Sequence, residues 1–64
     1  MPLVQVSIGK GRSTDQLRDL VSEVHKAVER TVDAKPDDIT VIVNEVEPNL
    51  WARGNRTIEE IRAT

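Results

Sequence analysis

Residues 13–32, STDQLRDLVSEVHKAVERTV, decide the fold of this chain. Apolar side chains recur there every three or four residues, which is the period of an amphipathic α-helix. Ser13 and Gln16 have the spacing of a capping box, which marks the start of a helix. Lys35-Pro36 marks its end, because proline does not continue a helix. These limits predict a helix of roughly 19 residues, about 28 Å long.

A β-strand is predicted on either side of this helix. Leu3 to Ile8 alternate apolar and polar side chains, which is typical of a strand with one buried face. Ile39 to Val46, ITVIVNEV, is rich in β-branched residues and is apolar on both faces through Val43. A strand of this length covers roughly 25 Å, so the helix returns the chain to the start of the first strand. The sequence therefore predicts a β-α-β unit with parallel strands and a right-handed crossover.

The last part of the chain predicts a smaller element. Pro48-Asn49 and Arg53-Gly54-Asn55 are turn sequences around Trp51, and they indicate an irregular or hairpin-like segment. Thr57 and Glu60 have the spacing of a second capping box, which opens a short helix of one or two turns. The fold class expected for the chain is thus α/β.

We expect the chain to form a single domain, residues 1–64. Its short length limits the size of the core. A chain of this length buries only about 60 % of the surface that its unfolded form exposes. With no cysteine and one histidine, disulfides are excluded and no metal site is expected. One helix covers one face of a two-stranded sheet, and two strands are too few to stand alone. The sequence therefore predicts that oligomerisation completes the fold.

Charge and hydropathy argue against several partners. Nine lysine and arginine residues against eleven acidic residues give a net charge of −2, which argues against nucleic acid and anionic membranes. The longest apolar stretch is far too short for a transmembrane span or a signal peptide. We therefore expect a cytoplasmic protein.

Pro2 has two interpretations. Proline is tolerated at the first residue of a strand, so Pro2 can simply mark a strand start. An initiator methionine before a small residue is usually trimmed, however, and removal of Met1 leaves Pro2 as a free secondary amine. An α-amine has a reference pKa of roughly 8. Desolvation or a nearby cation lowers that pKa toward neutrality, where a general base works best.

The loop after the first strand is the second candidate. Residues 9–13, GKGRS, either form a tight glycine turn with a solvated arginine or bind an anion. The N–H groups of a helix N-terminus and the guanidinium of Arg12 both favour a carboxylate or a phosphate. Trp51 is open to two interpretations as well, an interface anchor or a pocket wall.

The other chemically versatile side chains have structural explanations. They comprise a helix-flank histidine, acidic turn and capping pairs, and a small solvated basic patch: His25, Asp37-Asp38, Glu59-Glu60, and Arg53 with Arg56. In the sequence none of them forms a recognisable pattern of nucleophile and base.

Several of these features occur together: Pro2 after the initiator methionine, Gly11-Arg12-Ser13, the long helix, the second strand and Trp51. In this combination the chain resembles the 4-oxalocrotonate tautomerase family over nearly its whole length. The resemblance implies a tautomerase without cofactor that moves a proton between enol oxygen and carbon of a small carboxylate-bearing enol or keto acid. It implies that Pro2 is the base, that Arg12 binds and polarises the substrate carboxylate, and that Trp51 keeps the pocket apolar. It also implies dimers assembling to a hexamer, either a homohexamer or a mixed hexamer.

One position departs from the family pattern. Founding members have a second arginine near the start of the second strand, which binds the carbonyl region of the substrate, and Thr40 occupies that position here. A neutral hydroxyl does not replace a fixed charge, so a related 2-hydroxydienoate or another enol or keto acid becomes more plausible than 4-oxalocrotonate. Arg53 or Arg56, near Trp51, is a candidate to supply the missing charge by another route.

Two further functions stay open. A dehalogenase, decarboxylase or hydratase of the same superfamily needs a protonated Pro2, and usually a carboxylate that activates water. A non-catalytic subunit of a mixed hexamer is the alternative from another class, and Thr40 gives it some weight.

The expected strands also place the candidate residues. Pro2 begins the first strand and Arg12 follows its end, so more than about 20 Å separate them. Because the strands are parallel, Trp51 lies at the Arg12 end. We therefore expect a site that is shared between subunits.

Overall fold

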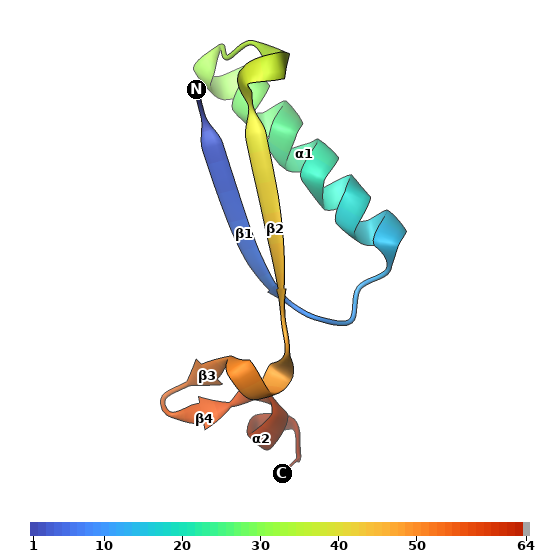
Figure 1. The fold of residues 1–64 in the computed structure, drawn as a ribbon, viewed down its shortest axis with the longest axis vertical. Coiled ribbons are helices and arrows are strands. Elements are labelled where there is room, and N and C mark those ends of the chain that lie inside the picture. Colours follow the sequence, from blue (N-terminus) through green and yellow to red (C-terminus); the bar gives the residue numbers. More distant parts are fainter. Residues whose placement is uncertain (64) are drawn as a thin grey trace.

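The computed structural model describes residues 1–63 as a β-α-β unit followed by a hairpin and a short helix (Figure 1). Strand β1 (Leu3–Gly9) leads into helix α1 (Thr14–Val32), and strand β2 (Thr40–Val46) pairs with β1 in parallel. This confirms the predicted β-α-β unit. β1 continues one residue beyond the predicted end, and β2 starts one residue later than predicted.

Helix α1 begins and ends at its capping residues. Ser13 Oγ accepts a hydrogen bond from the backbone N–H of Gln16 (3.1 Å), and Gln16 Oε1 accepts one from the N–H of Ser13 (3.0 Å). At the other end Asp33 takes a left-handed conformation, φ 54°, which stops the helix. The helix has 19 residues, the predicted length. Neither α1 nor any other helix within residues 1–63 is long and apolar enough to cross a membrane.

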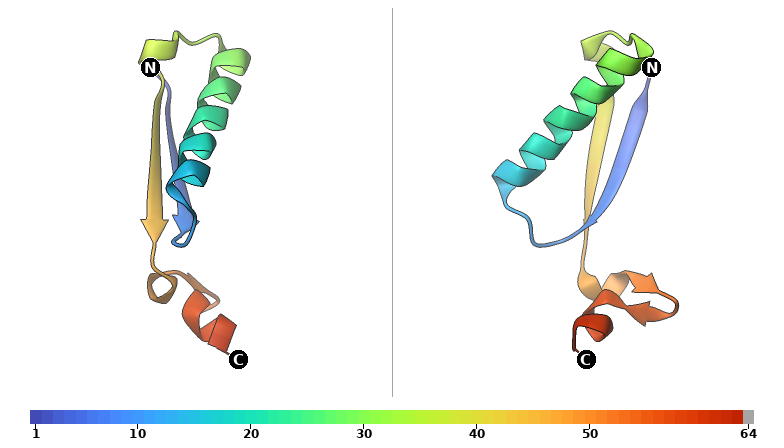
Figure 2. Two further views of the ribbon diagram at one scale, coloured as in Figure 1. Left: turned by 90° about the vertical axis from the view of Figure 1, so that its right-hand side faces the viewer. Right: turned by 180° about the vertical axis from the view of Figure 1, so that it is seen from behind.

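Helix α1 covers one face of the sheet and leaves the other bare (Figure 2). The side chains toward α1 are half-buried: Val4, Val6, Ile8, Val41 and Val43. The bare face carries three exposed cross-strand pairs: Leu3 with Thr40, Gln5 with Ile42, and Ser7 with Asn44. These six side chains are uncharged, which is unusual for a face left to water.

Residues 1–63 form an elongated structure without a closed core. Its radius of gyration is 14.9 Å, whereas a compact domain of this length has one of about 11 Å. Its accessible surface is 5108 Å², about 1000 Å² more than a folded monomer of this mass exposes. No side chain in the described part of the chain is fully buried.

The C-terminal segment extends past the end of the sheet (Figure 1). A 3-10 turn, η2 (Pro48–Leu50), leads into the antiparallel strands β3 (Ala52–Arg53) and β4 (Arg56–Thr57), and helix α2 (Ile58–Ala63) follows. Gly54-Asn55 forms the turn with φ of 59° and 65°, as a tight two-residue hairpin requires. This confirms the predicted hairpin-like segment and short last helix.

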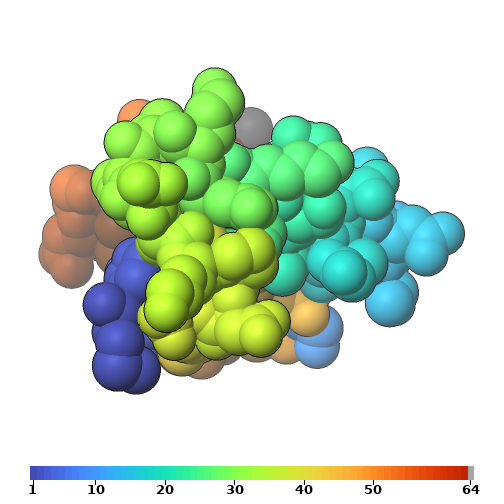
Figure 3. Space-filling view, turned by 90° about the horizontal axis from the view of Figure 1, so that it is seen from above, coloured from blue at the N-terminus to red at the C-terminus, as the bar shows by residue number. Residues whose placement is uncertain are grey.

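The N-terminus lies beside the start of β2. The backbone N–H of Thr40 donates to the carbonyl oxygen of Pro2 at 3.0 Å. Figure 3 shows the dark blue N-terminal end against the yellow-green segment that includes the 3-10 turn η1 (Pro36–Asp38). Pro2 is therefore at the end of the sheet opposite the loop of residues 9–13.

Candidate active site

A cavity of about 340 Å³ lies where the end of β1, the following loop and the C-terminal segment meet. We call it the Arg12 cavity; its lining consists of Ser7, Ile8, Gly9, Arg12, Trp51, Arg53, Ile58 and Arg62. It combines three guanidinium groups with an apolar wall of Trp51 and Ile58. None of these lining residues is a carboxylate or a histidine. Such a lining suits a small anion with an apolar body.

The loop holds Arg12 at the end of β1. Arg12 Nη1 donates to the carbonyl oxygen of Gly9 at 3.1 Å, which folds the side chain back over the strand. Gly11 has φ 137°, a conformation that side chains rarely adopt, so glycine is needed for the loop to turn here. Ser13 then caps α1. The sequence Gly11-Arg12-Ser13 thus places one arginine between a glycine turn and a helix cap.

Trp51 is joined to the start of α2. Its carbonyl oxygen accepts a hydrogen bond from the backbone N–H of Ile58 at 2.8 Å. Thr57 Oγ1 accepts from the N–H of Glu60 (3.1 Å), and Glu60 Oε1 accepts from the N–H of Thr57 (2.8 Å). The second predicted capping box is therefore present. These bonds tie the aromatic wall, the hairpin and α2 together on one side of the cavity.

A salt bridge ties together the two segments that leave the sheet. Lys10 Nζ lies 3.0 Å from Glu47 Oε1, and the backbone N–H of Lys10 donates to the carbonyl oxygen of Val46 at 2.9 Å. The hydrogen bond to Glu47, with the charge of its carboxylate, raises the pKa of Lys10. Both side chains are exposed, so the bridge contributes little stability. The bridge connects the arginine loop to the segment that leads to Trp51.

The structure brings together some of the predicted site residues and separates others. Arg12, Trp51 and Arg53 line one cavity. Pro2 and Thr40 lie together at the far end of the sheet, separated from that cavity by the seven residues of β1, about 23 Å. Within one chain, the expected base therefore does not reach the expected carboxylate-binding arginine.

Two arginines of the C-terminal segment differ in position. Arg56 is paired with Arg53 across the hairpin but does not line the Arg12 cavity. Arg62, which the sequence analysis missed, does line it. Its spacing from Ile58 in the sequence could have identified it, because residues four apart lie on one face of a helix.

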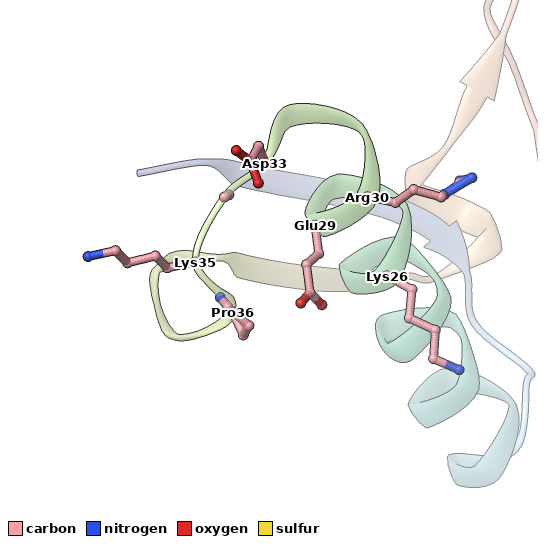
Figure 4. Close-up of a pocket in the computed structure, with 7 residues that line it drawn as sticks. Lys26, Glu29, Arg30, Asp33, Lys35 and Pro36 are labelled. Carbon is pink, nitrogen blue, oxygen red and sulfur yellow. The ribbon is translucent and has the colours of Figure 1, made fainter.

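A larger hollow, of about 690 Å³, lies between the end of α1 and η1 (Figure 4). Its charged lining alternates in sign: Lys26, Glu29, Arg30, Asp33 and Lys35. Figure 4 shows Lys26, Arg30 and Lys35 pointing away from one another. This hollow has the mixed charge of a solvated surface and no aromatic wall, so we assign the candidate site to the Arg12 cavity.

His25 is half-buried on the flank of α1, as predicted. Its Nε2 lies 3.5 Å from Glu29 Oε1, one helical turn later, a partner that the sequence analysis did not name. Within residues 1–63 no three histidine, cysteine or acidic side chains come together as a metal site requires.

The fold and the cavity define a class of small β-α-β proteins with an arginine-lined cavity at one end of the sheet. The family model described as "Tautomerase enzyme" matches residues 2–61. The chain therefore belongs to the tautomerase family, a family of isomerases. This confirms the family that the sequence suggested.

Similar proteins agree with this assignment. A protein of Staphylococcus aureus named a probable tautomerase is 49 % identical over 51 residues, which is 80 % of this chain and 84 % of that protein. A 4-oxalocrotonate tautomerase homologue of the tomaymycin biosynthetic pathway superposes with a TM-score of 0.95 at 32 % identity, covering 98 % of this chain and 97 % of that one. A heterohexamer 4-oxalocrotonate tautomerase of Chloroflexus aurantiacus superposes with a TM-score of 0.90 at 29 % identity, covering 97 % and 100 %.

Proposed function

We propose that this chain is a cofactor-independent tautomerase that moves a proton between the enol oxygen and a carbon atom of a small 2-hydroxydienoate or another enol or keto acid. Pro2, freed by removal of Met1, is the general base. Arg12 binds and polarises the substrate carboxylate, and Trp51 forms the apolar wall. The Arg12 cavity is the observation that supports this proposal, because it pairs a loop-held arginine with an aromatic residue.

The chemistry follows from these groups. The neutral secondary amine of Pro2 takes the proton from the enol hydroxyl and becomes an ammonium, which then delivers a proton to carbon and returns to its starting form. A nearby guanidinium lowers the pKa of an amine, which keeps a fraction of it neutral near pH 7. The planar fork of Arg12 fits a carboxylate in a bidentate way and stabilises charge that the dienolate delocalises toward it. No redox step or further reactant is needed.

A second chain supplies the base in this proposal. Three observations support an oligomer: the bare uncharged sheet face, the excess of accessible surface and the length of β1 between Pro2 and Arg12. We propose that dimers assemble into a homohexamer, with each Arg12 cavity receiving Pro2 from a neighbour. The heterohexameric relative makes a mixed hexamer the alternative assembly.

The proposal depends on Met1. With Met1 attached, the nitrogen of Pro2 is a tertiary amide and has no basicity. Two forms of the protein, with Pro2 first and with Met1 retained, are identified by intact mass and compared in the ketonisation of phenylenolpyruvate and of 2-hydroxydienoates. We expect turnover only from the form that begins with Pro2. Equal turnover from both forms would exclude Pro2 as the base.

A non-catalytic subunit of a mixed hexamer is the second candidate function. It is favoured by Thr40, a neutral residue whose backbone N–H donates to the carbonyl oxygen of Pro2. In that case the form beginning with Pro2 is inactive alone and assembles only with a second chain type. A hydrolytic activity of the same superfamily is less well supported, because the described lining of the Arg12 cavity offers no carboxylate to activate water.

A further inference from the structure

We infer that Lys10 and Glu47 are positioning residues that hold two walls of the Arg12 cavity together, the loop that carries Arg12 and the segment that carries Trp51. This inference rests on the proposed function and adds to it a pair of residues outside the cavity. Neither Lys10 nor Glu47 lines the Arg12 cavity, so both act through the side chains that do. Loss of the pair is expected to weaken substrate binding and to leave the fold intact.

The first argument is the place of the pair at the end of the sheet. The parallel register of β1 and β2 ends with Gly9 opposite Val46, and the next residue of each strand is Lys10 or Glu47. Beyond this point the two segments separate toward different walls of the cavity. The backbone N–H of Lys10 donates to the carbonyl oxygen of Val46 at 2.9 Å, and its Nζ lies 3.0 Å from Glu47 Oε1. Lys10 therefore joins the segments twice, at the point where they part.

The second argument is that both ends of the bridge are tied to the cavity walls. On the loop side, Arg12 Nη1 donates to the carbonyl oxygen of Gly9 at 3.1 Å, one residue before the bridge. On the other side, the carbonyl oxygen of Glu47 accepts from the backbone N–H of Leu50 at 2.9 Å, which closes the turn η2 directly before Trp51. The bridge thus joins two turns that are already fixed locally, and each turn leads into a cavity wall.

The third argument is the attachment of the C-terminal segment. Figure 1 shows this segment beyond the end of the sheet, where it follows directly on β2. A segment that continues from the end of one strand can swing relative to the sheet. Such a swing changes the space between Arg12 and Trp51, and a small misplacement of groups that hold a substrate is costly. The bridge restricts the swing even though an exposed ion pair adds little to folding stability.

The kinetic test breaks the bridge and then rebuilds it with the charges exchanged. Lys10→Gln and Glu47→Gln should each raise KM about two- to fivefold, the size expected for an exposed ion pair, with little change in kcat. The double variant Lys10→Glu with Glu47→Lys should recover most of the wild-type KM. Lys26→Gln and Glu23→Gln are the matched controls, because they break another exposed bridge, on α1 and outside the cavity. An unchanged KM in the single variants, an equal rise in the controls or no recovery on charge exchange would overturn the inference.

Amide hydrogen exchange, followed by NMR in the protein without substrate, separates this inference from the proposed function. The backbone N–H of Lys10 donates to Val46 and that of Leu50 to Glu47, so both amides report on the segments that the bridge joins. In Glu47→Gln we expect the protection of both amides to fall about two- to fivefold. The amide of Thr40, at the far end of the sheet, is the internal reference and should not change.

The two tests have distinguishable failures. If the wild type turns over neither phenylenolpyruvate nor a 2-hydroxydienoate, the proposed function fails and hydrogen exchange alone decides the inference. Faster exchange of the Lys10 and Leu50 amides, with the Thr40 amide unchanged, then supports a bridge that holds the walls together. Unchanged protection of the Lys10 and Leu50 amides, or an equal loss at Thr40, refutes it.

Discussion

At the scale of single residues, Gly11 lies between the end of β1 and the cap of α1, and its φ of 137° suits glycine alone. The sequence identified Arg12 as an anion-binding candidate and Ser13 as a helix cap, because both depend on local chemistry and spacing. The positive φ of Gly11 and the contact from Arg12 to Gly9 depend on the path of the loop. A lone glycine fits many loop conformations, so the sequence alone could not predict the φ of Gly11 or the contact from Arg12 to Gly9.

We predict that Gly11→Ala weakens substrate binding and stability together. Nothing lies within 4 Å of an added Cβ, so the penalty comes from the backbone at φ 137°, and we expect about 1–3 kcal/mol. Movement of Arg12 then raises KM. Gly9→Ala is the control, because its φ is ordinary and its added Cβ meets Arg12 Nη1 at 3.8 Å, a normal contact. Urea unfolding at fixed protein concentration measures the stability of both variants, and steady-state kinetics measure their KM. Equal stability of the two variants would contradict the role of Gly11.

Lys10 and Glu47 give a prediction on pH. The pKa of Lys10 is raised in the folded protein, so the salt bridge contributes stability at neutral pH and loses it as the pH rises through that raised pKa, above about 10.4. We expect Glu47→Gln to lower the pKa of Lys10 in an NMR titration of its side chain. Glu45→Gln is the control, since Glu45 acts only through its charge and is the weakest cause. A larger change from Glu45→Gln than from Glu47→Gln would refute this assignment.

At the scale of elements, the sequence predicted the regular parts well. Helix α1 has a strong apolar period and a capping box, and the β-branched run of β2 is bounded by Pro36 and Pro48, so local rules were sufficient. The position of α2 was not predictable in the same way. It depends on the Trp51–Ile58 hydrogen bond and on the hairpin turn, and Arg62 became a site residue only through that placement.

We predict that the Ser13 cap stabilises α1 measurably. Ser13→Ala removes the acceptor for the Gln16 N–H and should cost about 1 kcal/mol in the free energy of unfolding. Ser22→Ala makes the same chemical change inside α1, where alanine is the better helix former, and should be neutral or slightly stabilising. Urea unfolding at equal protein concentration compares them. A Ser13→Ala variant as stable as Ser22→Ala would show that the capping box does not hold the helix start.

At the scale of the whole molecule, we expect no folded monomer at micromolar concentration. A single chain leaves Leu3 58 % and Ile42 39 % exposed on a bare, uncharged sheet face. Burial of that surface stabilises an assembly and not an isolated chain. Sedimentation should show an oligomer, with hexamer mass in the proposed assembly. A stable folded monomer would show that the exposed sheet face does not need to be buried in an assembly.

We predict that different chains supply the two parts of the proposed site. Pro2 and the Arg12 cavity lie at opposite ends of β1, so the proposed chemistry requires Pro2 of one chain and Arg12 of another. Pro2→Ala and Arg12→Ala should each be nearly inactive, because one lacks the secondary amine and the other the carboxylate-binding guanidinium.

Joint unfolding and reassembly of these two variants in equal amounts should restore activity. In a symmetric assembly with random mixing, roughly a quarter of the sites receive an intact proline and an intact arginine. If both residues acted within one chain, every chain would carry a defect and mixing would restore nothing. Mixed oligomers are confirmed by mass, and each variant reassembled alone is the control. Activity can be regained only where two chains meet. Its recovery would therefore show that a neighbouring chain completes the Arg12 cavity, as the bare sheet face and the length of β1 lead us to expect.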